Sequence, residues 1–259
     1  MRATIKKDAF TLLQFSDLHL FAQPEKYVHD ICPEQSFLKV FKQAIETHPA
    51  IDLILLTGDL AEDPVDTVYN RLKERLSGYQ IPIVCLPGNH DNYPVMMKIF
   101  SQPPMTCNKL TRLGNWQIIA LNSQIVGEKQ GMIAAPEMAF LQDTLRSSKD
   151  YFSVIALHHH CIPTGSSWMD HMQLEQSEQF LNTLKNYNSI KLILFGHTHQ
   201  TPETHTTGTT ILGTPSTCYQ FKPNSNHFAI TKEPPCYRSV TLFPNGEITS
   251  TVHTLTPGN

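Results

Sequence analysis

Short apolar runs alternate with segments of helical periodicity along the first three quarters of the chain. Residues 10–15 form an apolar run typical of a buried strand, and Phe37 and Phe41 recur at helical spacing within residues 34–48. This alternation is typical of α/β layering. The remaining elements expected from the pattern are strands at 51–57, 81–86, 117–121, 152–157 and 191–195, with helices at 64–77, 136–146 and 173–186.

The pattern becomes mostly β from about residue 204. A Pro-Asn-Gly turn at 244–246 predicts a hairpin between the last two strands. Because the first part alternates and the last part is mostly β, we expect an α/β protein with two packed mixed sheets flanked by helices. No repeat, low-complexity tract or linker divides residues 1–259, which indicates a single domain. The strands expected in this last part are 209–212, 237–243 and 247–254.

Composition excludes several classes of protein. With 40% hydrophobic and 17% charged residues in 259, the chain is typical of a folded globular protein. A net charge of -3 lacks the basic excess that nucleic acids and anionic membranes require, so neither is expected as a partner. The chain starts without a signal-peptide core and has no apolar run long enough to span a bilayer. Its six cysteines are scattered, which indicates reduced thiols in a cytoplasmic protein.

Thirteen histidines are the unusual feature of the composition, and several follow expected strands together with carboxylates. Because loops at the carboxyl ends of strands converge on one crevice, these segments are expected to share one site. In an extended segment, residues i and i+2 project to the same side, which pairs Asp17 with His19 and His197 with His199. The five segments are Asp17-Leu18-His19, Gly58-Asp59, Gly88-Asn89-His90-Asp91, His158-His159-His160 and Gly196-His197-Thr198-His199.

Carboxylate and imidazole ligands together suit manganese, iron or zinc. One tetrahedral ion needs three or four ligands and more are present here, so we expect a two-metal site in which Asp59 is the natural bridge. Iron and manganese are the first choice, with zinc, magnesium or cobalt as alternatives. Each motif alone is common in turns, caps or solvated strand ends, and their joint order is what indicates the site. The expected ligands are Asp17, His19, Asp59, Asn89, His158, His197 and His199.

The ordered set D-x-H, G-D, G-N-H-D, H-H and G-H-x-H resembles the calcineurin-like metallophosphoesterase superfamily over nearly the whole chain. Residues 20–23, 158–170 and 214–223 are also similar to the bacterial class III cyclic nucleotide phosphodiesterases. The resemblance implies a four-layer α/β/β/α sandwich with a dinuclear centre between the loop edges of its two sheets. It further implies two ligand sets: Asp17, His19, Asp59 and His199 for the first ion, and Asp59, Asn89, His158 and His197 for the second.

The histidine triplet leaves one ligand of the second ion open. His158 is favoured because it ends the expected strand and heads the His-His pair of the family, and His159 is the reserve candidate. His160 would border the site. The histidines without a motif are interpreted as loop or surface imidazoles, and they are His29, His48, His171, His205, His227 and His253.

The resemblance implies hydrolysis of a small-molecule cyclic nucleotide, 3′,5′-cyclic AMP, to 5′-AMP. A hydroxide bridging the two ions would attack phosphorus, Asn89 would hold the phosphate, and His90 would protonate the leaving oxygen. Asp91 would either orient the His90 ring or cap a helix over 93–100. The residues expected to contact the substrate are His19, Asn89, His90 and His199.

Other functions stay open at this point. One is a broader phosphodiesterase acting on 2′,3′-cyclic nucleotides or glycerophosphodiesters, and another is a non-catalytic scaffold that keeps the fold. Tyr219, Phe221 or Trp168 would stack on adenine, or else belong to the core. The sequence does not distinguish a monomer from a homodimer.

Overall fold

Two sheets form the centre of the protein, for which the computed structural model describes residues 8–206 and 208–256. The strands of the first sheet are β1 (Phe10–Phe15), β2 (Leu53–Thr57), β3 (Ile83–Leu86), β4 (Ser101–Gln102), β5 (Met105–Thr106), β12 (Cys236–Leu242) and β13 (Ile248–Thr254). Their order is β13-β12-β1-β2-β3-β5-β4. The strands of the second sheet are β6 (Leu110–Leu113), β7 (Trp116–Ala120), β8 (Phe152–Ala156), β9 (Ile190–Phe195), β10 (Glu203–Thr206) and β11 (Thr209–Gly213). Their order is β10-β11-β9-β8-β7-β6, and both sheets mix parallel and antiparallel pairs.

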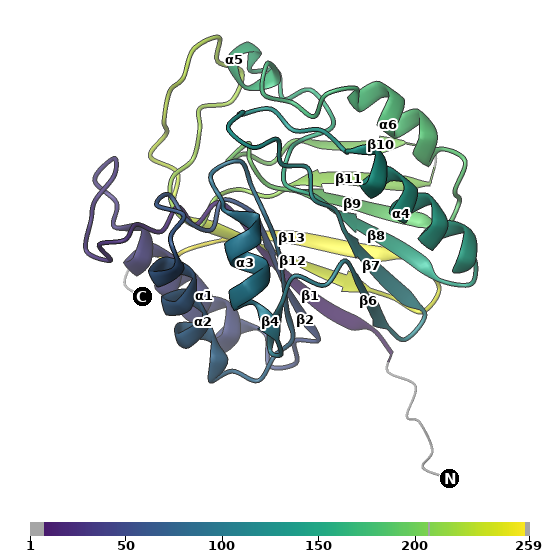
Figure 1. The fold of residues 1–259 in the computed structure, drawn as a ribbon, viewed down its shortest axis with the longest axis horizontal. Helices are drawn as coiled ribbons and strands as arrows, with labels where there is room; N and C mark the ends of the chain where they lie inside the picture. Colours follow the sequence, from purple (N-terminus) through teal and green to yellow (C-terminus); the bar gives the residue numbers. More distant parts are fainter. Residues whose placement is uncertain (1–7, 207, 257–259) are drawn as a thin grey trace.

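Helices cover the outer faces of both sheets. The helices of the described residues are α1 (Pro33–Thr47), α2 (Asp66–Ser77), α3 (Tyr93–Ile99), α4 (Ala135–Ser147), α5 (Ser167–Asp170) and α6 (Ser177–Leu184), and all but α5 lie on these faces. Figure 1 shows α1, α2 and α3 beside the first sheet, α4 and α6 beside the second, and α5 in the loops above them. The expected fold class, two mixed sheets flanked by helices in an α/β/β/α sandwich, is therefore confirmed.

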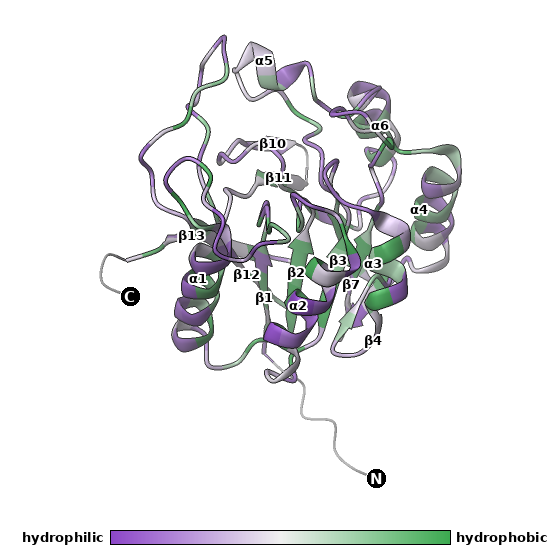
Figure 2. Ribbon diagram, turned by 60° about the vertical axis from the view of Figure 1, so that its left-hand side comes forward, coloured by the Kyte–Doolittle hydropathy of each residue, from purple (hydrophilic) through white to green (hydrophobic). Residues whose placement is uncertain are grey.

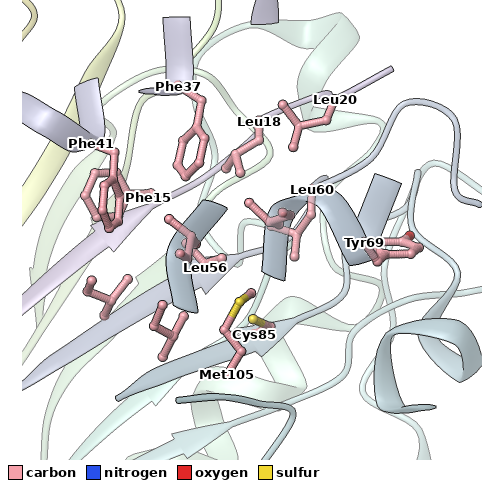
Figure 3. Close-up of a cluster of buried hydrophobic side chains, with 14 of the residues drawn as sticks. Phe15, Leu18, Leu20, Phe37, Phe41, Leu56, Leu60, Tyr69, Cys85 and Met105 are labelled. Carbon is pink, nitrogen blue, oxygen red and sulfur yellow. The ribbon is translucent and has the colours of Figure 1, made fainter. Parts of the chain in front are cut away.

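Three buried apolar clusters fill the three interfaces between these layers. Along β2, Leu53 and Leu55 pack between the sheets, whereas Ile54 and Leu56 pack under the helices of the first sheet. Figure 3 shows Leu56 in the cluster under these helices, near Leu60. Successive residues of a strand point to opposite faces, so a strand with layers on both sides is apolar at every position. Figure 2 shows the result as hydrophobic colour along β2.

The elements expected from the sequence are present, with one of them clearly shortened. The helix expected at 173–186 begins only at Ser177, because the preceding backbone pairs with neighbouring loops. Leu174 N donates to His160 O at 2.9 Å, and Glu175 N donates to Gly131 O. The pattern did not predict α5 or the short strands β4, β5, β6 and β10, which are too short to show a period.

The C-terminal strands complete the first sheet. β12 pairs antiparallel with β1, where Phe10 lies opposite Leu242, and it also pairs with β13. In the turn between β12 and β13, Gly246 has φ 88° and donates to Phe243 O at 3.0 Å, which confirms the predicted hairpin. The six cysteines are free thiols. In the part of the chain that the structure describes, no helix combines the length and the apolar character needed to cross a membrane.

Candidate metal centre

The loops that follow β1, β2, β3, β8 and β9 meet at the carboxyl ends of these strands. Hydrogen bonds join the loops directly: Asp17 N to Gly58 O (3.0 Å), Gly196 N to His158 O (3.1 Å), His197 N to Asp17 Oδ2 (3.0 Å) and His90 N to Asp59 Oδ1 (2.9 Å). The five histidine- and carboxylate-bearing segments therefore lie together, although they are far apart in the chain.

Asp17, His19 and His199 form the first cluster, and all three are buried. His19 Nε2 lies 3.1 Å from His199 Nε2, which lies 3.4 Å from Asp17 Oδ1. The other ring nitrogens are engaged: His19 Nδ1 lies 2.8 Å from Glu62 Oε2, and His199 Nδ1 lies 2.7 Å from the Tyr219 carbonyl oxygen. Both rings therefore carry a proton on Nδ1 and present a lone pair on Nε2.

The first cluster fits a metal ion. The two Nε2 lone pairs face each other and the Asp17 carboxylate without a proton between the rings, and a cation satisfies all three groups. The one donor to this carboxylate among the described residues is the backbone N–H of His197. Imidazole nitrogens bound to one ion at about 2.0–2.1 Å lie roughly 3 Å apart, which agrees with the 3.1 Å between His19 Nε2 and His199 Nε2. Burial raises the pKa of Asp17, but His199 and His158 hold that pKa below its ordinary value, so the carboxylate is ionised.

Asp59, Asn89 and His158 form the second cluster. His158 Nε2 lies 3.2 Å from Asn89 Oδ1 and 3.4 Å from Asp59 Oδ2, while its Nδ1 donates to the Thr57 carbonyl at 2.8 Å. Burial lowers the pKa of His158, but the charge of Asp59 and their hydrogen bond raise it to about 9. A proton and a metal ion therefore compete for the same position. Ligand atoms of Asp17, Asp59 and His158 lie within 4.8 Å of one another, so Asp59 stands where the two clusters meet.

His197 extends the second cluster. Its ring centroid lies 5.0 Å from that of His158, and its Nε2 is buried with no hydrogen-bond partner among the described residues. Burial and the neighbouring imidazoles keep the pKa of His197 well below its ordinary value, so the ring is neutral. A neutral imidazole with an unpartnered nitrogen suits a metal ligand.

The three rings of the histidine triplet have different partners. His158 faces the oxygens of the second cluster. His159 Nδ1 instead lies 2.8 Å from Ser123 Oγ, and the His160 ring stacks on His197 with centroids 5.6 Å apart. His158 is therefore directed at the second cluster, whereas His160 packs beside it. Ligand atoms of His158, His159 and His197 also lie within 4.8 Å of one another, and His159 Nε2 is buried without a hydrogen-bond partner among the described residues. His158 remains the favoured ligand and His159 the reserve candidate.

Five of the expected ligands adopt left-handed backbone conformations, which are rare for residues other than glycine. The φ values are 55° at Asp17, 50° at His19, 50° at Asp59, 65° at His197 and 46° at His199. The expectation of extended D-x-H and H-x-H segments is therefore wrong, because tight turns bring each pair together. Each such conformation costs roughly 1–3 kcal/mol and is found where the surrounding structure enforces it, often at functional sites.

Two glycines allow the loops to approach one another. A Cβ atom on Gly88 would lie 2.1 Å from Asp59 Oδ1, and one on Gly58, whose φ is 92°, would lie 2.4 Å from His158 Nδ1. Any larger residue at either position would displace an expected ligand.

His90 lies at the open side of the site, with its side chain 37% exposed, and its partner is Glu62. Glu62 Oε2 lies 3.1 Å from His90 Nδ1 and 2.8 Å from His19 Nδ1. Burial lowers the pKa of His90, but the hydrogen bond with Glu62 and the charge of Asp59 raise it to about 9. The hydrogen bonds with His19 and His90 hold the pKa of Glu62 well below its ordinary value. Glu62 is not among the residues expected from the sequence, where its position three residues after Asp59 is the only signal for it.

Both expectations for Asp91 are wrong. Helix α3 is capped by Asn92, whose Oδ1 accepts from Val95 N at 3.3 Å. Asp91 instead joins two loops: the one after β3, which contains Asn89 and His90, and the one after β2. Its carboxylate accepts hydrogen bonds from Leu60 N (3.1 Å), Ala61 N (3.1 Å), Gly88 N (2.9 Å) and the Tyr69 hydroxyl (3.0 Å).

Comparison with known proteins gives similarities over most of the chain. Residues 10–201 match the family model described as calcineurin-like phosphoesterase. The chain is 35% identical over 257 residues to the 3′,5′-cyclic adenosine monophosphate phosphodiesterase CpdA of Vibrio vulnificus, covering 99% of this chain and 94% of that protein. It is 34% identical over 248 residues to CpdA of Haemophilus influenzae, covering 95% and 90%. A dimetal phosphatase from Danio rerio shares the fold, with a TM-score of 0.64 at 13% identity over 96% of this chain and 100% of that one.

Proposed function

Because this chain belongs to the calcineurin-like phosphoesterase family, we propose that it is a metal-dependent phosphodiesterase that hydrolyses 3′,5′-cyclic AMP to 5′-AMP. The relatives that it matches over nearly their whole length carry that activity in their names. The observation that carries the proposal is the pair of buried acceptor clusters that meet at Asp59. Such a centre, once it holds two cations, attracts a phosphate anion.

The two clusters supply the residues that would hold the ions. Bound ions would supply Lewis acidity, which lowers the pKa of coordinated water to about 7 and offsets charge on the phosphate. We propose iron or manganese, because a mixture of carboxylate, amide and imidazole ligands suits these ions. The proposed sets are Asp17, His19, Asp59 and His199 for the first ion, and Asp59, Asn89, His158 and His197 for the second.

His90 is placed to protonate the leaving oxygen. Its Nδ1 is engaged by Glu62 at 3.1 Å, which leaves the proton on Nε2 for transfer. As the bond between phosphorus and the 3′ oxygen breaks, that oxygen takes the proton from Nε2, so no free alkoxide forms.

Asn89 is placed to hold the phosphate. Its Oδ1 is directed at His158 Nε2, which leaves the Nδ2 group to donate to a phosphate oxygen. His19 and His199, at the first cluster, complete the proposed substrate contacts.

The proposed function is tested by a substrate panel with the purified protein and added manganese. We expect turnover of 3′,5′-cyclic AMP to exceed that of 3′,5′-cyclic GMP, 2′,3′-cyclic AMP and a simple aryl phosphodiester. Intact cyclic AMP beside a hydrolysed second diester would contradict the substrate and favour the broader phosphodiesterase. Fewer than two bound metal equivalents, together with no turnover of any diester, would favour a non-catalytic scaffold.

We expect Glu62→Gln to weaken both metal binding and catalysis by roughly 10- to 100-fold, the usual effect of removing a hydrogen-bond partner from a metal-bound histidine. The neutral side chain removes the charge that orients His19 and His90 through their Nδ1 atoms. Manganese titration of the metal-free protein measures the first effect and turnover the second. The matched control is Glu128→Gln. Glu128 is exposed, and its carboxylate has no hydrogen bond or ion pair with another residue that the structure describes. Equal manganese affinity and turnover in the two variants would refute this role.

We also propose that the enzyme works in the cytoplasm. Free thiols at all six cysteines and an intracellular nucleotide as substrate support this location.

A further inference from the structure

Aromatic rings lead outward from the first metal cluster to the surface. The Phe221 ring stacks on His199 with centroids 4.1 Å apart, and the Tyr219 ring stacks on His19 at 5.6 Å. The next rings continue this series, with His29 at 5.0 Å from Tyr219, Phe228 at 6.2 Å from His29 and Trp168 at 5.4 Å from Phe228. Phe228 thus lies two ring contacts from the metal ligand His199, by way of Phe221.

The geometry points to a nucleobase subsite formed by His29, Tyr219 and Phe228, in which the adenine of the substrate stacks on the exposed Phe228 ring. This inference rests on the proposed function, because that function requires a place for the base beside the phosphate. An aromatic surface that begins at the metal ligands and ends in solvent is continuous with the phosphate site. Aromatic rings bind bases by stacking, since every base has a π-face.

His29 is held in place by a strained turn. Val28 and Ile31 exchange two backbone hydrogen bonds of 2.9 Å, and the residues between them, His29 and Asp30, have φ of 50° and 63°. Two consecutive positive φ values are the requirement of a type I′ turn, which favours glycine and asparagine. The loop between β1 and α1 therefore accepts backbone strain at His29, and that turn presents the imidazole to Tyr219 and Phe228.

The imidazole of His29 is also free to read the edge of a base. In residues 8–206 and 208–256, its ring nitrogens have ring neighbours but no hydrogen-bond partner. A base edge carries both donors and acceptors, and an imidazole offers one of each. From the sequence His29 is expected to be a plain loop or surface imidazole, whereas in the structure it contacts Tyr219, which in turn contacts His19.

Phe228 is exposed although its loop is well anchored. The residue is 54% exposed, while Lys222 N donates to Ala229 O at 2.8 Å and Thr231 N donates to Gln220 O at 2.9 Å. Ser225 N donates to Ser166 Oγ at 3.2 Å, which ties this loop to the residues before α5. In Figure 1 the loops between β1 and α1 and between β11 and β12 project on the same side of the sheets. An ordered loop that holds a phenylalanine in solvent next to a metal centre suits a stacking platform.

The kinetic test compares cyclic AMP with a base-free analogue, the methyl riboside 3′,5′-cyclic phosphate. We expect Phe228→Ala to raise KM for cyclic AMP about tenfold, the effect of losing one stacking partner, and to leave the analogue unaffected. His29→Ala is expected to act in the same direction. Met97→Ala, an exposed apolar side chain on α3, is the matched control. An unchanged KM for cyclic AMP, or an equal loss on both substrates, would overturn the subsite.

A binding test needs no turnover. Of the two tryptophans, Trp116 is fully buried in the core whereas Trp168 borders Phe228, so Trp168 emission reports on the subsite. Adenosine, which has no phosphodiester, is expected to quench the emission of the wild type and of Met97→Ala but not of Phe228→Ala or Trp168→Phe. Absence of quenching in the wild type overturns the subsite. Failure of the wild type to hydrolyse cyclic AMP is a separate result that contradicts the proposed function.

Discussion

Asp59→Asn is expected to lower phosphodiesterase turnover more than about a thousandfold and to reduce bound metal from two equivalents to one or none. Asp59 stands where the two clusters meet, and its carboxylate is the charge that both proposed ion positions share. Asparagine keeps the shape and can still accept from His90 N, so the protein is expected to fold. Metal analysis and single-substrate turnover on the same preparation measure both effects.

The control for this variant is a neighbouring carboxylate in the same loop. Asp63 Oδ2 accepts from Ala22 N at 2.9 Å, a bond that asparagine can also make. Asp63→Asn is therefore expected to keep two metal equivalents and turnover within about twofold. If Asp59→Asn retains two equivalents and wild-type turnover, the bridging role is wrong.

Asn89→Ala is the second substitution with a large expected effect, a loss of roughly 100- to 1,000-fold in turnover. The change removes the Oδ1 that lies 3.2 Å from His158 Nε2 and the Nδ2 group proposed to donate to the phosphate. One proposed ion position loses a ligand and the phosphate loses a donor. Manganese binding at equilibrium measures the loss of the metal ligand. Steady-state kinetics on cyclic AMP, run in parallel, measure the loss of the phosphate donor.

A matched control is Asn182→Ala, an exposed residue of α6 that belongs to neither cluster. It is expected to leave both measurements unchanged. Wild-type activity in Asn89→Ala would remove Asn89 from the ligand set of the second ion. The same loss in Asn182→Ala would instead show a general effect on the fold.

Local sequence was enough to predict the layers and the loops that carry the candidate ligands, which the structure brings together. β2 reads as an unbroken apolar run because Leu53 and Leu55 face one layer while Ile54 and Leu56 face another. A buried strand of this kind can be recognised from its own residues, without reference to the rest of the chain. The expected ligands directly follow strands of this kind, and parallel strands bring their carboxyl ends to one edge.

Side-chain partners were not predictable in the same way. Asp91 is next to His90 in the chain, and on that ground it was expected to orient the ring. The structure turns Asp91 toward the backbone of Leu60 and Ala61, and Glu62 approaches His90 from another loop. Neighbours in the chain point in different directions in a tight turn, so adjacency does not predict contact.

The sequence by itself determined the α/β class and the loops that carry the candidate ligands, because apolar patterning and strand-end positions are local properties. Only the tertiary structure decided that Glu62 supports His90, that His158 faces Asp59 and Asn89, and that His29 lies against Tyr219. These are contacts between loops from different strands, and at Asp59 and His29 a left-handed backbone also sets the direction of the side chain. No spacing along the chain encodes such directions, since they depend on how the loops pack against one another.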